Sequence, residues 1–355
     1  MIRGMERINF GMVGTGRITD WVLKGAVLDP RFRAAAVCSR SLEKGRAFAT
    51  AHHIPDVYTS LDELADDPSI DVVYIGTPNQ THHDFAIRAM RGGKHVLCEK
   101  PLGSNAREVR EMIAVAREQD VVLMEAMIST LSPNFKEVRR RLKDLGTVRH
   151  YFGCFCQYSS KYDLLKRILA GEDRSPVPAS FNPDCSGGAL MDIGIYPVYP
   201  MVALFGKPAS VKADLTTCKV PAGGVRKTVD LQGAVQFEYD GMSAGILYSK
   251  IADSHLNTEI ACDGGILSLD QIHITRHVDF IRRGTPTSGR CAGPSPEDVT
   301  VPNDADEYLC EFREFIDLLE SGRRESDSNS LAHSLAVAEI LDEIRRQGGI
   351  AFPAD

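Results

Sequence analysis

Short apolar runs alternate with longer amphipathic stretches along the first third of this chain. Each run has the length of a buried strand, and the stretches between the runs carry apolar residues at helical spacing. Ser60 and Glu63 form a capping box that marks the start of one of these helices. Strands that alternate with helices in this way predict βαβ units and a parallel, doubly wound sheet. The apolar runs cover residues 8–13, 34–38, 71–76, 95–99 and 121–124.

The pattern changes after Glu125. Residues 148–158 and 211–217 alternate between polar and apolar side chains, which is typical of half-buried strands. Asp240-Gly241 and Asp263-Gly264 indicate tight hairpin turns between further strands. Consecutive strands joined by tight turns form antiparallel sheets, so this half is predicted to be an α+β domain.

Three helices are predicted in the second half. One runs over residues 132–145, because Ser-Pro starts it and a glycine follows its end. Two amphipathic helices close the chain, at residues 305–321 and 330–347. Residues 284–296 are rich in Gly, Pro, Ser and Thr and are predicted to form a surface loop.

Composition and length narrow the class of protein. The chain has 355 residues, 43% of them hydrophobic and 25% charged, with a formal charge of -7. This length suits two domains, which we expect at residues 1–126 (α/β) and 127–355 (α+β), with the C-terminal helices able to pack back on the first domain. A modestly acidic chain without a dense basic run is not expected to bind nucleic acid. We expect neither a membrane span nor a secretion signal.

Nine cysteines, an odd number, are scattered along the chain without paired spacing. This usage favours a reducing, cytoplasmic location over a disulfide framework. Cys154 and Cys156 invite a metal interpretation, but they continue the alternation of residues 148–158 and fit one face of a strand. We therefore predict no metal site.

Lys100 is the first candidate for chemistry. It ends the apolar run 95–99 and is followed at once by Pro101. In an open α/β sheet, ligands bind outside the carboxyl ends of the strands, so a cation delivered there points toward substrate or cofactor. The alternative is a surface lysine at a strand end. Glu99, its neighbour, is included among the candidate cofactor-binding residues.

A glycine turn follows the first strand and leads into a helix. Gly14 permits a tight turn, Gly16 lets the backbone approach a pyrophosphate, and the helix start supplies free N–H groups. Thr19 occupies the third small position of this fingerprint, which weakens the motif. The predicted cofactor-binding residues of the turn are Gly14, Thr15, Gly16, Arg17 and Ile18. The helix should pack one face on the sheet through Ile18, Trp21, Val22, Gly25 and Ala26.

The second strand ends on Ser39-Arg40, where an NAD-preferring site usually offers an acid to the ribose 2′-hydroxyl. A serine hydroxyl and a guanidinium instead match a 2′-phosphate. We therefore predict NADP as cofactor, with NAD as the other possibility and Lys44 as a third contact. The alternative is a solvated arginine in a βα loop.

Four further residues fall at the same predicted sheet edge as Lys100. As isolated residues they are turn formers and a helix cap, but grouped around a nucleotide turn they are predicted to line a nicotinamide pocket. They are Thr77, Pro78, Asn79 and His82.

Asp192 and Tyr196 are the candidate chemical groups of the second half. If their segment is helical, the two side chains lie on one face, about 6 Å apart at Cβ. Pro197 and Pro200 predict a kink beyond them. The alternative is that Asp192 caps a helix and Tyr196 is a core aromatic residue.

Four motifs in this order resemble the glucose–fructose oxidoreductase, inositol dehydrogenase and rhizopine-catabolism (Gfo/Idh/MocA) family. The resemblance spans nearly the whole chain. It implies a Rossmann domain that binds NAD(P), and a second domain of mostly antiparallel sheet that covers the nicotinamide and often forms the oligomer interface. It also implies that Lys100 contacts the reacting hydroxyl or carbonyl. The motifs are the Gly14-Thr15-Gly16 turn, Gly76-Thr77-Pro78-Asn79 with His82, the run from Gly93 to Pro101, and Asp192-Ile193-Gly194-Ile195-Tyr196.

Many sugar and inositol dehydrogenases of that family carry His four residues after the Asp, where this chain has Tyr196. This variant is similar to the NADP-linked dihydrodiol dehydrogenase and xylose dehydrogenase branch, and Glu125-Ala126-Met127 resembles the same branch. Residues 128–131 lack the aromatic and arginine residues found there, so that branch's substrate is not carried over.

The resemblance implies hydride transfer between NADP and a secondary alcohol, its ketone or a lactol of a small sugar, polyol or trans-dihydrodiol. Tyr196 could accept the hydroxyl proton if a cation such as Lys100 lowers its pKa, or Lys100 could accept it directly. Asp192 would orient substrate hydroxyls or hold Lys100. Two other hypotheses stay open: an NAD-dependent inositol or sugar-acid dehydrogenase, and a non-catalytic dinucleotide sensor. A homodimer or homotetramer through the C-terminal sheet is expected by analogy.

Overall fold

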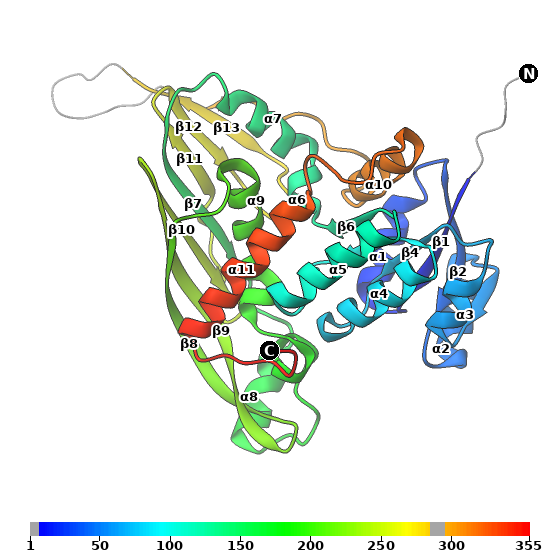
Figure 1. Ribbon diagram of the computed structural model, residues 1–355. Coiled ribbons are helices and arrows are strands. Elements are labelled where there is room, and N and C mark those ends of the chain that lie inside the picture. The colour runs from blue at the N-terminus through cyan, green and yellow to red at the C-terminus, as the bar shows by residue number, and fades with distance from the viewer. Residues whose placement is uncertain (1–6, 285–294) are drawn as a thin grey trace, which may run out of the picture. The chain divides into compact units, whose positions relative to one another are not determined.

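The computed structural model describes residues 7–284 and 295–355 (Figure 1). The chain divides into two compact units. The first comprises the chain up to Leu131 together with Asp304–Ala338, and the second comprises Ser132–Asn303 with Glu339–Asp355. The C-terminal segment 304–338 therefore groups with the first unit. Most of the surface loop predicted at residues 284–296 lies outside the described residues.

The first unit contains a six-stranded sheet with the order β3-β2-β1-β4-β5-β6, and all its strand pairs are parallel. This order reverses direction between β1 and β4, which confirms the predicted doubly wound Rossmann sheet. The strands are β1 (Ile8–Val13), β2 (Phe32–Cys38), β3 (Asp56–Tyr58), β4 (Val72–Ile75), β5 (His95–Glu99) and β6 (Leu123–Ala126). The helices are α1 (Arg17–Ala26), α2 (Leu42–His52), α3 (Leu61–Asp66), η1 (Asn79–Thr81), α4 (His82–Arg91), α5 (Ala106–Glu118), α6 (Ile128–Leu131) and α10 (Leu309–Ser321).

Both faces of this sheet are covered, which explains why its central strands are apolar throughout. All four residues of β4 are buried. On one face, Val73 and Ile75 join a core cluster with Met90 of α4 and Met112 of α5. On the other face, aromatic rings of α10 pack on the strands: the ring of Phe312 lies 5.6 Å from that of Phe10 and 5.9 Å from that of Tyr74. The segment 304–338 thus completes the core of the first unit.

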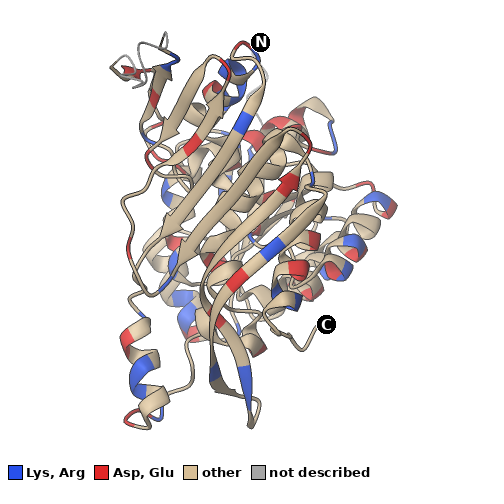
Figure 2. Cartoon of the chain, turned by 90° about the vertical axis from the view of Figure 1, so that its left-hand side faces the viewer, with Lys and Arg blue, Asp and Glu red and all other residues tan. Residues whose placement is uncertain are grey.

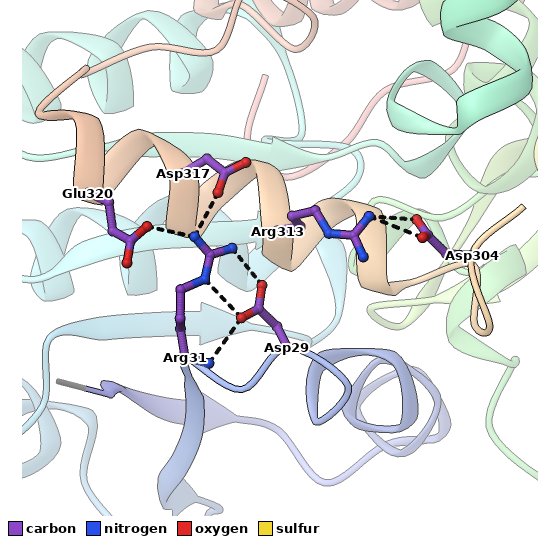
Figure 3. Close-up of polar contacts among 6 residues, drawn as sticks. All are labelled: Asp29, Arg31, Asp304, Arg313, Asp317 and Glu320. Carbon is purple, nitrogen blue, oxygen red and sulfur yellow. Dashed lines mark hydrogen bonds and ion pairs between the residues drawn. The ribbon is translucent and has the colours of Figure 1, made fainter. Parts of the chain in front are cut away.

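An ion-pair network fixes α10 to the loop before β2 (Figure 3). The guanidinium of Arg31 donates hydrogen bonds to both carboxylate oxygens of Asp29, at 2.9 and 2.7 Å. It also reaches Asp317 at 2.8 Å and Glu320 at 2.6 Å, both on α10. The bond from Arg31 holds the pKa of Asp29 below its usual range. Because Asp29 is buried, this fork is a specific attachment point for α10.

The predicted inner face of α1 is wrong at one position. Val22, Gly25 and Ala26 are buried as expected, but Trp21 is 41% exposed. The Arg17 guanidinium lies 4.9 Å from the centre of the Trp21 ring. Trp21 thus stacks with an arginine at the surface and does not contribute to the core.

The second unit contains an eight-stranded sheet with the order β14-β13-β12-β11-β7-β10-β9-β8. Every strand pair is antiparallel except β7 with β10, so the prediction of a largely antiparallel sheet is confirmed. The hairpin turns expected at Asp240-Gly241 and Asp263-Gly264 join β9 to β10 and β11 to β12. The strands are β7 (Val148–Cys156), β8 (Ser210–Ala222), β9 (Val225–Tyr239), β10 (Met242–Ser249), β11 (Thr258–Cys262), β12 (Gly265–Leu269), β13 (Val278–Arg282) and β14 (Glu297–Asp298).

Helices cover one face of this sheet. Ser132 caps α7 as predicted, since its Oγ accepts a hydrogen bond from the amide of Phe135. The other face turns outward, and its strands carry few charged residues (Figure 2). The helices of the second unit are α7 (Pro133–Leu142), α8 (Tyr162–Ala170), η2 (Ala179–Phe181), η3 (Pro183–Cys185), η4 (Leu190–Gly194) and α9 (Ile195–Phe205), and α11 (Leu331–Gln347) begins in the first unit and ends in the second.

Within residues 7–284 and 295–355, one helical segment, Pro183–Phe205, is long and apolar enough to cross a membrane by length and composition alone. We did not predict such a segment from the sequence. However, 78% of its apolar window is buried inside the protein, which is typical of the core helix of a soluble fold.

Candidate active site

The glycine turn after β1 is built around close backbone contacts. Gly14 has φ +109°, and a Cβ there would lie 2.6 Å from the carbonyl oxygen of Gly76. The amide of Gly14 donates to the carbonyl of Cys38 at 3.0 Å, which places the end of β2 beside the turn. Only glycine fits these constraints at position 14.

Gly16 leaves open space at the start of α1. It is the N-cap residue, no side chain caps the helix there, and a Cβ at Gly16 would have nothing within 4 Å. The first amides of α1, from Arg17 onward, therefore face a cradle that can admit a pyrophosphate. The structure also accommodates Thr19, which stands at the third small position of the glycine fingerprint. Thr19 is fully buried, and a Cβ at Gly76 would lie 2.8 Å from its Oγ1. The missing side chain of Gly76 makes the room that Thr19 needs.

The predicted 2′-phosphate residues lie directly after β2. Ser39 is half-buried and Arg40 is exposed, while Lys44 projects into solvent from the first turn of α2. Ser41 caps this helix by accepting a hydrogen bond from the amide of Lys44 at 3.3 Å. The structure therefore places two exposed cations around the start of α2, and the end of β2 that precedes them lies beside the glycine turn.

His82 joins the loop after β4 to the loop after β5. Its Nε2 lies 2.8 Å from the carbonyl oxygen of Thr77, and its Nδ1 lies 2.8 Å from that of Pro101. The ring is fully buried, and burial lowers its pKa. His82 thus connects the two loops through its two ring nitrogens. Pro78 and Asn79 lie between Thr77 and α4, the helix that begins at His82. Pro78 is exposed and Asn79 is half-buried.

Lys100 follows β5 directly and is half-buried. The Glu99 side chain points inward, where it accepts a 2.8 Å hydrogen bond from the phenol of Tyr74 on the neighbouring strand. Burial raises the pKa of Glu99. A second buried carboxyl, Glu311 of α10, has a pKa well above its usual range because of burial and the charge of Glu99. A group of buried acids therefore underlies the strand end that presents Lys100.

Glu125 near the end of β6 is also buried. It accepts a hydrogen bond from the amide of Leu102 at 2.9 Å, and its carboxyl also bonds with Ser334. Burial raises its pKa to about 7. Asn329 ties down the same strand end, donating to the carbonyls of Glu125 and Met127 at 3.1 and 3.0 Å.

In the second unit, Asp192 lies in the π-helical turn η4, which continues into α9 with Tyr196 in its first turn. The prediction that Asp192 and Tyr196 lie on one face was conditional on α-helical spacing in this segment. Instead, the amide of Ile195 donates to the carbonyl of Leu190, five residues back. The wider turn occurs just before Pro197, which has no N–H for an ordinary helical bond. Single π-turns of this kind are frequent at functional sites.

Asp192 forms an ion pair with Lys250, and Oδ2 of the carboxylate accepts from the ammonium. The Lys250 side chain is 4% exposed, whereas that of Asp192 is 38% exposed. Asp192 does not occupy an N-cap position, because Ala189 and Gly194 are the N-cap residues of η4 and α9. Its side chain is the more accessible member of the pair. Sequence reasoning missed Lys250. The available signal was a lysine that continues the buried, alternating face of β10.

The ring of Tyr196 packs in an aromatic cluster with Phe155 and His273. The Phe155 and His273 rings are stacked at 4.1 Å, and Tyr196 meets them edge-on at 5.6 and 5.9 Å. All three are partly exposed. His273 was not predicted, because nothing in its local sequence distinguishes it from a loop histidine.

The fold and these residues define a class of protein, the NAD(P)-dependent oxidoreductases with an added α+β unit. Residues 8–127 match the oxidoreductase family with NAD-binding Rossmann fold, and residues 135–268 match the Gfo/Idh/MocA C-terminal domain. The chain belongs to the Gfo/Idh/MocA oxidoreductase family, as the sequence motifs predicted.

Two relatives are similar to this chain over almost the full length of both proteins. It is 39% identical to scyllo-inositol 2-dehydrogenase (NADP(+)) of Bacillus subtilis (strain 168), over 98% of this chain and 99% of that protein. It is 33% identical to trans-1,2-dihydrobenzene-1,2-diol dehydrogenase of Xenopus laevis, over 97% and 99%. Among solved structures, levoglucosan dehydrogenase in complex with NADH and levoglucosan has the same fold, with a TM-score of 0.82, 20% identity and coverage of 97% and 98%.

These similarities establish that the protein is an enzyme, a dehydrogenase or reductase acting on CH–OH groups, and that its cofactor is NADP or NAD. The cradle at Gly16 and the close approach of Gly14 to Gly76 fit that group.

Proposed function

We propose that this protein is an NADP-dependent oxidoreductase for a small polyhydroxylated substrate, and that it interconverts a secondary alcohol or lactol with the corresponding carbonyl. The observation that carries this proposal is the arrangement along one sheet edge. β1, β4 and β5 are neighbours, and their carboxyl ends deliver the glycine turn, the Thr77 loop and Lys100 together. Ligands of open α/β sheets bind at this edge.

The preference for NADP rests on Arg40. The residues directly after β2 are Ser39 and Arg40, where an NAD-preferring site usually carries an acid, and an exposed guanidinium beside Ser39 is suited to a 2′-phosphate. Lys44 adds a second positive charge in the next helix. The name of the relative from Bacillus subtilis, which specifies NADP(+), supports the same assignment.

The substrate class is inferred from the second unit and from the relatives. The partly exposed Asp192 carboxylate accepts hydrogen bonds only, so it suits a hydroxyl donor. The named substrates of the relatives, an inositol and a dihydrodiol, carry neighbouring hydroxyls. We infer a sugar, polyol or trans-dihydrodiol with a hydroxyl next to the reacting carbon.

Bound nicotinamide supplies the hydride acceptor or donor in this chemistry. The protein residues then manage the proton and the orientation of the substrate. We assign transfer of the hydroxyl proton to Lys100 or Tyr196 and hydroxyl binding to Asp192. The first amides of α1, with Gly14, Thr15, Gly16 and Ile18, hold the pyrophosphate, and Thr77, Pro78, Asn79, His82 and Glu99 shape the nicotinamide side of the site.

We also propose self-association through the outward face of the eight-stranded sheet, as a homodimer or homotetramer. The pleat turns Phe152, Leu247, Ile266 and Ile281 toward this face, and each is partly exposed. Light scattering after chromatography should give a mass that is a multiple of 39.0 kDa. Leu247→Asp should reduce it to the monomer mass.

We place the enzyme in the cytoplasm. The cysteines of the described residues are all free thiols, which is the state favoured in a reducing compartment. Fractionation of the source cells should find the protein with soluble cytoplasmic markers.

NADPH fluorescence tests the function directly. The wild-type protein is incubated with NADP and a panel of inositols, sugars, trans-dihydrodiols and sugar acids, and in the reverse direction with NADPH and the matching ketones. Turnover of a neutral polyol with NADP supports the proposal. Turnover only with NAD, on an inositol or sugar acid, would replace it with an NAD-dependent dehydrogenase. Cofactor binding without turnover on any compound would favour a dinucleotide sensor.

A further inference from the structure

Lys250 occupies a position where the sheet otherwise places apolar side chains. Ala244, Ile246 and Tyr248 alternate along β10 toward the covered face and are buried. Lys250 is the next residue in that alternation and is only 3% exposed. A buried ammonium is costly unless an anion and further polar groups compensate it. A lysine at this position therefore requires a specific partner.

Asp192 is that partner, and the exposures of the two side chains give the pair a direction. The Asp192 side chain is 38% exposed, whereas the Lys250 side chain is 4% exposed. The ring of Phe181 lies 4.6 Å from the Lys250 ammonium and contributes a cation–π contact. A molecule that approaches from solvent thus meets the Asp192 carboxylate, and the ammonium lies behind it.

Both members of the pair are held by their backbones. The amide of Lys250 donates to the carbonyl of Leu231, and its carbonyl accepts from the amide of Ser159, each at 2.9 Å. On the other side, the buried carboxylate of Asp230 accepts a 2.6 Å hydrogen bond from the amide of Leu190, the first residue of η4. The sheet therefore fixes the ammonium, and also the start of the π-turn that carries Asp192.

We propose that Lys250 is a positioning residue for Asp192: it holds one carboxylate oxygen so that the group is fixed, charged and turned toward the hydroxyls of the substrate. This inference rests on the proposed function. The ion pair as a whole is neutral, so it can receive an uncharged polyol without adding net charge to the site. Lys250 acts through Asp192 and does not touch the substrate.

The test compares Lys250→Met, Lys250→Arg and Lys227→Met on the polyol that the wild type turns over. Lys227 is the matched control, because it pairs with Asp184 at 2.5 Å in the same unit, with both side chains more than a quarter exposed. Removing the Lys250 ammonium leaves Asp192 without the charge that favours its ionised form. Lys250→Met should lower kcat/KM at least tenfold, raise KM, and move the acidic limb of the pH profile upward. Lys250→Arg should restore part of the loss, and Lys227→Met should match the wild type.

NADP binding separates positioning from a structural role. The Kd for NADP should stay within about twofold of the wild type in every variant, because the cofactor residues lie in the other unit. In a double-mutant cycle, Lys250→Met should add little to the loss caused by Asp192→Asn, since both remove the same interaction. If Lys250→Met does not fold, Lys250→Arg and Asp192→Asn carry the test through their pH profiles.

Three results would count against the proposal, and they are distinguishable. Wild-type protein that binds NADP but turns over no polyol would remove the proposed function and this inference together. Suppose instead that the wild type turns over a polyol and that Lys250→Met folds and shows the same turnover, KM and pH profile. That result would remove the Lys250 inference alone and make the pair purely structural. Full additivity of the two losses in the double-mutant cycle would also count against it.

Discussion

The phenol of Tyr74 donates a 2.8 Å hydrogen bond to Oε1 of Glu99, one residue before Lys100. The two side chains come from β4 and β5, adjacent strands whose ends form the proposed cofactor edge. Burial raises the pKa of Glu99, and the bond from Tyr74 opposes that rise. This contact therefore ties together the two strand ends that carry the Thr77 loop and Lys100.

Tyr74→Phe should destabilise the protein by about 1–2 kcal/mol near pH 8, the usual cost of a buried acceptor that loses its donor. Without the phenol, the pKa of Glu99 rises further. A carboxyl with a raised pKa contributes stability that is lost as pH increases, so the deficit should be smaller at pH 5 than at pH 8. Urea unfolding at both pH values measures it.

Tyr58→Phe is the matched control, because that phenol bonds to Asp67 at 2.6 Å, at the edge of the same unit. There the bond lowers the pKa of Asp67, so removing it should not produce a deficit that grows between pH 5 and pH 8. Identical losses at both pH values in Tyr74→Phe would contradict the role given to the Tyr74 bond.

Lys100→Met should lower kcat by at least about 100-fold, the scale of a lost proton-transfer or charge-stabilising group. The Kd for NADP should change far less, since the phosphates are held by the glycine turn and the residues after β2. Stopped-flow turnover and fluorescence titration separate the two effects. Lys24→Met, at a side chain that is 62% exposed on α1, should leave both unchanged. Unaltered turnover in Lys100→Met would remove Lys100 from the mechanism.

Arg40→Ala should weaken NADP binding by about 10- to 100-fold, the cost of a charge-assisted hydrogen bond, and leave NAD binding nearly unchanged. The reason is that only NADP carries the 2′-phosphate. Arg33→Ala is the control, because Arg33 is exposed on β2 near the end opposite to the one that Arg40 follows. Equal losses for both cofactors would assign Arg40 to another part of the dinucleotide, and a clear NAD preference in the wild type would overturn the NADP proposal.

Much of the fold could be predicted because its signals are local. The signals for the strand before Lys100, for the glycine turn and for the helices capped by Ser60 and Ser132 each lie within a few residues of the element that they specify. Trp21 shows the limit of periodicity: its spacing fits the buried face of α1, yet contact with Arg17 at the surface decides its position. A hydrophobic pattern identifies a helix but does not fix which edge residue enters the core.

The candidate site of the second unit was harder to predict, because its contacts join distant segments. Lys250 and Asp192 are 58 residues apart, and His273 meets Tyr196 from a loop beyond β12. In the π-turn, the amide of Ile195 bonds to the carbonyl five residues back and not to the carbonyl four residues back. Pro197 is the only sequence feature that indicates this difference. In the sequence, the long-range pairing of Asp192 and Lys250 leaves only one sign: a lysine at a strand position where the pattern otherwise places buried apolar residues.

Glu125→Gln should make the protein more stable at alkaline pH. Burial raises the pKa of Glu125 from 4.5 to about 7, so the stability that its protonated form contributes is full below pH 4.5 and is lost as pH rises through about 7. A pKa difference of this size corresponds to about 3 kcal/mol. Glutamine does not ionise, and it keeps an oxygen for the Leu102 amide. We expect near-equal stability at pH 5 and a gain of about 1–3 kcal/mol for the variant at pH 8.5.

Urea unfolding of wild type and variant across this pH range measures the difference. Glu118→Gln serves as control, because Glu118 is exposed at the end of α5 and should show no comparable change with pH. A Glu125→Gln curve that runs parallel to the wild-type curve from pH 5 to pH 8.5 would mean that the buried carboxyl keeps its charge without cost. The bond with Ser334, the bond from the Leu102 amide and the charge of Lys100 all act to lower the pKa of Glu125, and together they would then outweigh its burial.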